Sequence, residues 1–249
     1  MKLPRTIFIT GTDTGVGKTI VTAAVCSCIK SSGKRVAAMK PIQTGTDTQK
    51  TLDIEFVYKV LDEEFLIDDV CPYRFTKPLS PKLASEVSGK EIHVNDILSA
   101  YKTLEEKFEY VVIEGAGGIL APVKNNYFIV DLINEMESPV IIVTRPALGT
   151  INHTLLTIES AKNKGLSILG IIVNKYPIDP DDSELTNPDE IASISGLPIL
   201  GIIPEIQEVN VEYGHIGSIR QDSKKYLSSL FGGKYHFKYQ SSTSKLLYS

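Results

Sequence analysis

Short apolar runs rich in β-branched residues alternate along the chain with longer segments of helical character. The runs are continuously apolar, as expected of strands that are covered on both faces of a parallel sheet. They predict strands at Thr6–Thr10, Val36–Met39, Tyr110–Ile113, Pro139–Thr144, Ile168–Val173 and Pro198–Ile203. The segments between and after them predict helices at Lys18–Ser31, Leu52–Leu61, Val94–Lys107, Thr150–Asn163, Pro188–Ser195 and Asp222–Leu230.

This alternation predicts one doubly wound α/β domain over residues 1–231, with a mostly parallel sheet and helices on both faces, as in P-loop NTPases. Residues 232–249 form a tail rich in Gly, Lys, Tyr and Ser, which the pattern leaves open as an ordered extension or a frayed end. Ligands of such sheets gather at the carboxyl ends of the strands. The functional residues are therefore sought at those ends.

A glycine-rich loop, Gly11–Thr19, follows the first predicted strand and opens the first predicted helix. Its backbone N–H groups and the helix N-terminus suit phosphate oxygens, with Lys18 reaching the β- and γ-phosphates and the Thr19 hydroxyl binding Mg²⁺. Five residues separate Gly11 from Gly17, whereas the standard pattern has four. A plain glycine-rich turn with an exposed lysine is the less favoured alternative, because strand, helix and the Gly-Lys-Thr ending are all present.

Three further charged residues are expected near this loop. Lys40 follows the second predicted strand and adds a second cation, which suits a reaction with anionic intermediates. Glu114 ends the third strand, where P-loop enzymes often carry an acidic Mg²⁺ partner. Asp53 lies in the first turn of a helix, where the helix dipole alone also favours an acidic residue. Thr19, Asp53 and Glu114 are the predicted Mg²⁺ ligands, because Mg²⁺ prefers oxygen.

Composition narrows the class of protein. With 42% apolar residues, 22% charged residues and a formal charge of −4, the chain is typical of a globular protein and lacks the basic excess of a nucleic-acid-binding one. The sparse cysteines, Cys26, Cys28 and Cys71, predict reduced thiols in the cytoplasm. Neither a signal-peptide core nor an apolar run of about 20 residues is present, so no membrane association is expected.

Taken together, Gly11–Thr19, Lys40–Gly45, Glu114–Gly118 and Leu148–His153 resemble the dethiobiotin synthetase family, over about residues 5–206 and in the same order. The resemblance implies an ATP-dependent cyclo-ligase of biotin biosynthesis that forms the ureido ring of dethiobiotin from 7,8-diaminononanoate and CO₂. The reaction passes through a carbamate and a carbamic–phosphoric anhydride and releases ADP and phosphate. The resemblance also implies Mg²⁺, a homodimer and no nucleic-acid partner.

The same resemblance implies a role for each matching residue. Lys40 and Lys18 are the catalytic lysines, and Thr14 and Thr44 contact the diamine or its carbamate. The carboxylate tail of the substrate is held across the dimer interface by Leu148, Gly149 and Asn152. ATP is bound by Gly15, Val16, Gly17, Lys18, Thr19, Ile20, Asp53, Glu114, Gly115, Ala116 and Gly117, and its adenine by Asn174, Lys175, Pro204, Glu205 and Ile206. Lys82 stands where the family commonly has histidine.

Two other functions fit parts of the pattern. A cobyrinate-type amide synthase shares the ATP-binding half but carries a glutaminase domain with a nucleophilic cysteine, whereas no cysteine follows residue 206 here. A switch or positioning ATPase that binds a protein partner would carry a second lysine near the start of the loop, where this chain has Asp13. ATP turnover that depends on the diamine and bicarbonate would separate the synthetase from both.

Overall fold

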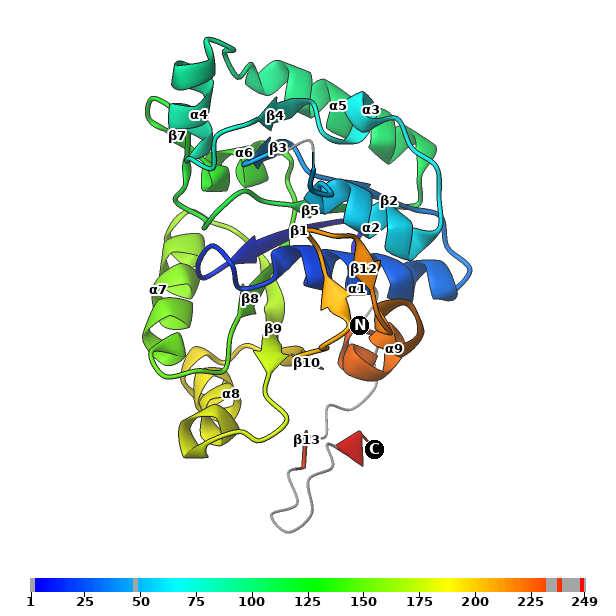
Figure 1. Cartoon of the computed structure of the whole chain (residues 1–249). Helices are drawn as coiled ribbons and strands as arrows, with labels where there is room; N and C mark the ends of the chain where they lie inside the picture. The colour runs from blue at the N-terminus through cyan, green and yellow to red at the C-terminus, as the bar shows by residue number, and fades with distance from the viewer. Residues whose placement is uncertain (1–2, 47–48, 232–236, 239–246, 249) are drawn as a thin grey trace.

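A six-stranded parallel sheet in the order β10-β9-β8-β1-β5-β2 forms the centre of the computed structural model, which describes residues 3–46, 49–231, 237–238 and 247–248 (Figure 1). Its strands are β1 (Thr6–Gly11), β2 (Val36–Met39), β5 (Tyr110–Glu114), β8 (Val140–Thr144), β9 (Ile168–Tyr176) and β10 (Ile199–Pro204). All six predicted strands are confirmed, with ends that shift by up to three residues. The predicted fold class is therefore correct.

Helices cover both faces of this sheet. All six residues of β1 are buried, and successive side chains of a strand point to opposite faces, so both faces must be packed. Helix α1 (Lys18–Ser31) packs against β1, β2 and β5, with α2 (Asp53–Leu61) and α9 (Ile219–Tyr226) beside it. Helix α7 (Thr150–Asn163) packs against β8 and β9 and contacts α8 (Asp182–Ser195), while α5 (Val94–Lys107) packs against β5.

Several short elements were not predicted from the sequence. They are α3 (Ile67–Val70), α4 (Pro81–Ser88), α6 (Ile129–Glu135), η1 (Ser228–Phe231), and the pairs β3 (Ile42–Thr44) with β4 (Tyr73–Phe75), β6 (Pro122–Lys124) with β7 (Tyr127–Phe128), and β11 (Val209–Asn210) with β12 (His215–Ile216). In the tail, β13 (Phe237–Lys238) pairs antiparallel with β14 (Leu247–Tyr248). The rest of the tail beyond residue 231 lies outside the described residues. The two alternatives for it, an ordered extension or a frayed end, therefore concern residues that the structure does not describe.

The predicted start of α8 at Pro188 is wrong. The helix begins at Asp182, because the Asp181 carboxylate accepts a hydrogen bond from the Glu184 N–H at 2.8 Å and Glu184 accepts one from the Asp181 N–H at 3.1 Å. This reciprocal capping satisfies two N–H groups that the first turn leaves unpaired, so the helix starts before the proline. The last predicted helix, Asp222–Leu230, is also wrong in its bounds: α9 ends at Tyr226 and η1 follows.

Three cysteines lie in the packed interior. Cys26 and Cys28 are on α1, Cys71 follows α3, and all three are free and buried. Burial raises the pKa of the Cys28 thiol to about 11 and that of the Cys71 thiol to about 12. Among the described residues, no helix combines the length and the apolar character that crossing a bilayer requires.

Replacing Gly201 with alanine is expected to lower the free energy of unfolding by about 1–3 kcal/mol, because strand β10 touches the C-terminal segment there. A Cβ at this position would lie 2.4 Å from the carbonyl oxygen of Tyr226 and 2.6 Å from Cδ2 of Leu227. Urea denaturation would measure the loss. The matched control is Gly118→Ala, whose Cβ would meet only Gly11 O at 3.6 Å; equal stability of the two variants would contradict the close contact.

Candidate active site

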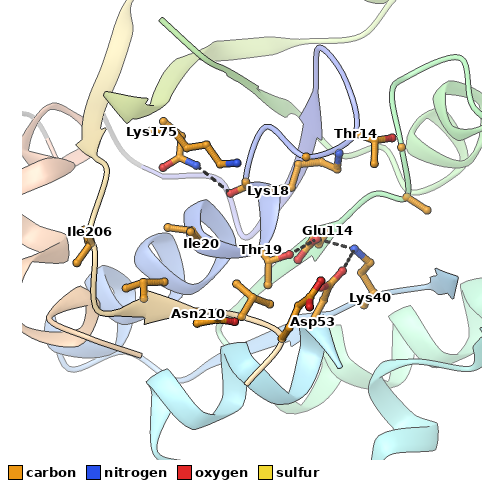
Figure 2. Close-up of a pocket in the computed structure, with 18 of the residues that line it drawn as sticks. Thr14, Lys18, Thr19, Ile20, Lys40, Asp53, Glu114, Lys175, Ile206 and Asn210 are labelled. Atoms are coloured by element: carbon orange, nitrogen blue, oxygen red, sulfur yellow. Dashed lines mark hydrogen bonds and ion pairs between the residues drawn. The ribbon is translucent and has the colours of Figure 1, made fainter. Parts of the chain in front are cut away.

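A cavity of about 630 Å³ opens at the carboxyl ends of the sheet strands. Figure 2 shows side chains from the phosphate loop, from Lys40, and from the ends of β5 and β9 pointing into it. The predicted site residues that line it are Thr14, Gly15, Gly17, Lys18, Thr19, Ile20, Lys40, Thr44, Asp53, Glu114, Ala116, Gly117, Asn174, Lys175, Pro204, Glu205 and Ile206. Residues far apart in the sequence, such as Thr14 and Ile206, are thus brought together in one cavity.

The phosphate loop connects β1 to α1 through two glycines in the left-handed region. Gly15 has φ 77° and Gly17 has φ 88°, values that side chains with a Cβ rarely adopt. Lys18 Nζ donates to the carbonyl oxygen of Asp13 at 3.0 Å, which holds the lysine against its own loop. Burial lowers the pKa of Lys18 to about 8, and the charge of Lys40 acts in the same direction. An anion in the loop would relieve both effects, as expected of a phosphate site.

Asn174 fastens the phosphate loop to the end of β9. Asn174 is 1% exposed, and its Nδ2 donates to the carbonyl oxygen of Val16 at 2.9 Å. The contact is so close that a Cβ on Gly17 would lie 2.0 Å from the same nitrogen. Asn174 therefore stabilises the phosphate loop, in addition to its predicted contact with adenine.

Lys40, Asp53 and Glu114 form one buried charged cluster beside the loop. Lys40 Nζ lies 2.7 Å from Asp53 Oδ2 and 2.5 Å from Glu114 Oε1, and Thr19 Oγ1 donates to Glu114 Oε1 at 2.9 Å (Figure 2). Burial opposes the charge of Lys40, but the two carboxylates outweigh it and raise its pKa above the ordinary value. Burial would raise the pKa of Asp53, yet Lys40 lowers it; burial prevails at Glu114, whose pKa is raised.

The cluster fits a divalent cation. Glu114 Oε2 is buried and has no hydrogen-bond partner among the described residues, which leaves one carboxylate oxygen of the cluster unsatisfied. Carboxylate and hydroxyl oxygens are the ligands that Mg²⁺ takes, and Mg²⁺ commonly completes its shell with water and substrate phosphates. Thr19 contributes a hydroxyl oxygen to this cluster, and Asp53 and Glu114 contribute carboxylate oxygens.

Some predicted residues lie away from the cavity. Leu148 is 86% exposed, and it precedes Gly149 and Asn152 at the start of α7, none of which lines the cavity. Val16 and Gly115 also do not line it; the Val16 side chain is 1% exposed and turned into the core.

One wall of the cavity was not predicted from the sequence; it is formed by Val209, Asn210, Val211 and Glu212. Ile42, which also lines the cavity, was not predicted either. The wall belongs to the β11–β12 hairpin, which is fastened by Thr51 N–H donating to Glu212 O at 2.9 Å and by the Lys50–Glu212 ion pair at 2.8 Å. The alternating Val209 and Val211 before Gly214 were a signal for a short hairpin.

A phosphate loop at the carboxyl edge of a parallel sheet, with a second lysine and buried carboxylates beside it, defines a P-loop nucleotide-dependent protein. A family model described as an AAA domain matches residues 5–212, most of the chain. The chain belongs to this family and, within it, to the ATP-dependent dethiobiotin synthetases. The predicted resemblance is thereby confirmed.

Two relatives carry this assignment. The chain is 41% identical over 215 residues to the ATP-dependent dethiobiotin synthetase BioD of Thermodesulfovibrio yellowstonii, with 82% of this chain and 90% of that one covered. It is 38% identical over 209 residues to the enzyme of the same name from Bacillus subtilis, with 84% and 90% covered. Among solved structures, the MinC:MinD cell division complex of Aquifex aeolicus matches with a TM-score of 0.59 at 15% identity, covering 95% of this chain and 99% of that one. That likeness shows the fold alone.

Proposed function

We propose that this protein is a dethiobiotin synthetase, an ATP-dependent ligase of biotin biosynthesis that closes a ureido ring on 7,8-diaminononanoate with CO₂. The observation that carries the proposal is the placement of Lys40 beside the phosphate loop, in one cavity with Lys18. Two lysines around a phosphate-sized space suit a reaction in which an anion attacks a phosphoryl group. The identity with named synthetases over most of the chain supports the same reaction.

The proposed reaction has three steps. One amine of the substrate adds to CO₂ and loses a proton, which gives a carbamate. A carbamate oxygen attacks the γ-phosphorus of ATP, a new P–O bond forms, and the bond to ADP breaks. The second amine then attacks the carbamic carbon of this mixed anhydride, closes the ring and expels inorganic phosphate. Positioning and neutralisation of charge supply most of the acceleration in such phosphoryl transfers.

Each residue of the cavity receives a role in these steps. Lys18 binds the γ-phosphate oxygens, and Lys40 stabilises the negative charge of the carbamate and of the phosphoryl group during its transfer. Thr14 and Thr44 line the same cavity as Lys40 and contact the diamine or its carbamate. Mg²⁺, held by Thr19, Asp53 and Glu114, would neutralise charge on the phosphates. These roles suit groups whose charges are already fixed before the substrates arrive.

The adenine is proposed to lie at the ends of β9 and β10, against Asn174, Lys175 and the Pro204–Ile206 segment. Lys175 and Ile206 lie across the phosphate loop from Lys40 (Figure 2). The nucleotide therefore spans the loop with its base on one side and its γ-phosphate toward the charged cluster. Val16 and Gly115 support this arrangement through their backbones.

A homodimer explains the residues that lie outside the cavity. The N-terminus of α7, with Leu148, Gly149 and Asn152, is proposed to receive the substrate carboxylate of a second subunit, since such helix ends suit anions. Figure 1 places α7 and α4 along the same side of the molecule, and each carries exposed apolar side chains, among them Leu156 and Leu83. We place this enzyme in the cytoplasm, with residues 1–231 as its one domain.

The proposal is tested by mixing the protein with MgATP and measuring released phosphate while each co-substrate is omitted in turn. Phosphate release is expected only with both 7,8-diaminononanoate and bicarbonate, because the carbamate is the phosphoryl acceptor. With ¹³C-bicarbonate, mass spectrometry should find dethiobiotin carrying one label. Turnover that ignores both co-substrates would favour the switch or positioning ATPase and defeat the proposal.

A further inference from the structure

The charged cluster holds one ammonium group between two carboxylates. Lys40 Nζ uses two of its three N–H donors on Asp53 Oδ2 and Glu114 Oε1, at 2.7 and 2.5 Å. The Lys40 side chain is 6% exposed and that of Glu114 is 2% exposed, so water does little to screen these charges. Both partners of Lys40 are residues to which the proposed function assigns the divalent cation.

Lys40 and a divalent cation would therefore compete for the same carboxylate oxygens of Asp53 and Glu114. A buried carboxylate left without a cation is costly, which accounts for the tight approach of Lys40 in the described arrangement. The ammonium nevertheless supplies one positive charge against two carboxylates, and Glu114 Oε2 has no partner in the described parts of the chain. A divalent cation would neutralise both carboxylates and use the unpartnered oxygen, so it would replace the lysine with a gain in pairing.

We infer that Lys40 is the resident counter-ion of the metal site, and that binding of a divalent cation releases its ammonium group toward the reacting anion. This inference rests on the proposed function for the identity of the metal ligands. Lys40 is anchored where β2 ends, and its four-carbon stem lets the ammonium group turn toward the Thr44 side of the same cavity. The lysine is thus held inactive by the carboxylates until the metal arrives with the nucleotide.

The exchange couples two binding events. If the cation weakens the hold of the carboxylates on Lys40, then an anion that draws Lys40 away must strengthen cation binding by the same factor. Metal, nucleotide and carbamate would therefore favour one another without any movement of the backbone. Removing Lys40 removes the competitor and leaves the carboxylates to the metal alone.

The test measures Mn²⁺ binding to the intact protein without nucleotide, by electron paramagnetic resonance of the free ion. Lys40→Met is expected to tighten Mn²⁺ binding about tenfold or more relative to the unaltered protein, within the usual range of coupling between sites. Lys40→Arg keeps a cation against both carboxylates and should stay within about threefold. Thermal unfolding shows whether each variant is folded, and Lys40→Ala replaces Lys40→Met if the latter is not.

A matched control is Lys175→Ala, which removes a cation from the same cavity without touching Asp53 or Glu114 within the described part of the chain. Equal tightening in this control and in Lys40→Met would mean bulk charge only and would overturn the inference. So would unchanged Mn²⁺ binding in Lys40→Met, provided that Glu114→Gln still weakens Mn²⁺ binding to the ADP complex. If Glu114→Gln and Asp53→Asn leave that binding intact, the assigned metal ligands fail, and this inference fails with them.

Discussion

Replacing Lys40 with methionine is expected to lower kcat for ring closure about a thousandfold, the loss typical when a donor to a developing anion is removed. The apolar side chain keeps the length of the stem but offers no charge to the carbamate or the phosphoryl oxygens. ADP binding measured in the presence of EDTA should change less than about threefold, because Lys40 contacts Asp53 and Glu114 whereas the phosphates are proposed to bind to the loop.

Steady-state phosphate release and calorimetric ADP titration measure the two quantities on the same preparation. Removing one member of a buried ion pair costs stability, so the midpoint of thermal unfolding must be recorded and the assay run well below it. Lys18→Met provides the contrast, since it should weaken ADP binding as well. Loss of ADP binding in Lys40→Met with residual ring closure would invert the division of work between the two lysines.

Replacing Gly17 with alanine is expected to weaken ATP binding about a hundredfold, or about 2.7 kcal/mol. The new Cβ would lie 2.0 Å from Nδ2 of Asn174, and the backbone there has φ 88°, which strains any residue with a Cβ. Relief requires either that Asn174 leave the Val16 carbonyl or that the loop turn away from α1. Either change would move the backbone N–H groups of the loop, which are proposed to bind the phosphates.

Equilibrium binding of a fluorescent ATP analogue measures this effect, and Gly15→Ala is its matched control. Gly15 also has a positive φ of 77°, but a Cβ there meets nothing within 4 Å. The control therefore keeps the strain and omits the collision, and its binding should fall by less than about tenfold. If both variants bind equally poorly, backbone strain alone governs the loop and the contact with Asn174 has no part in it.

The sheet could be predicted from the sequence because its strands are buried on both faces. Such strands are unbroken apolar runs, and Val36–Met39 was predicted with both of its ends correct. Helices α1, α5 and α7 were equally clear, because Gly33 and Gly165 mark two of their ends and the turns between elements are short. The β11–β12 hairpin was missed because its strands have two residues each, so the alternation of Val209 and Val211 is too short to distinguish a strand from a loop.

The site was predictable where neighbours in sequence act together, and less so where the fold brings distant residues into contact. Lys18 and Thr19 follow from the loop itself, and the positions of Lys40 and Glu114 follow from strand ends. The ion pair between these two joins residues 74 positions apart, and nothing in the local pattern specifies it. The bond from Asn174 to Val16 also joins residues far apart in the sequence, so the family resemblance implied only a contact with adenine for Asn174.

The three buried thiols make the opening of this fold observable by chemistry. Alkylating reagents attack the thiolate, and burial both shields Cys26, Cys28 and Cys71 and keeps them protonated at neutral pH. Alkylation must therefore wait until α1 or the segment after α3 separates from its neighbours. Because α1 begins at the phosphate loop, a bound nucleotide should stabilise this helix, which carries Cys26 and Cys28. The rate of labelling thus measures, without any enzymatic assay, how much a bound nucleotide stabilises the fold against local opening.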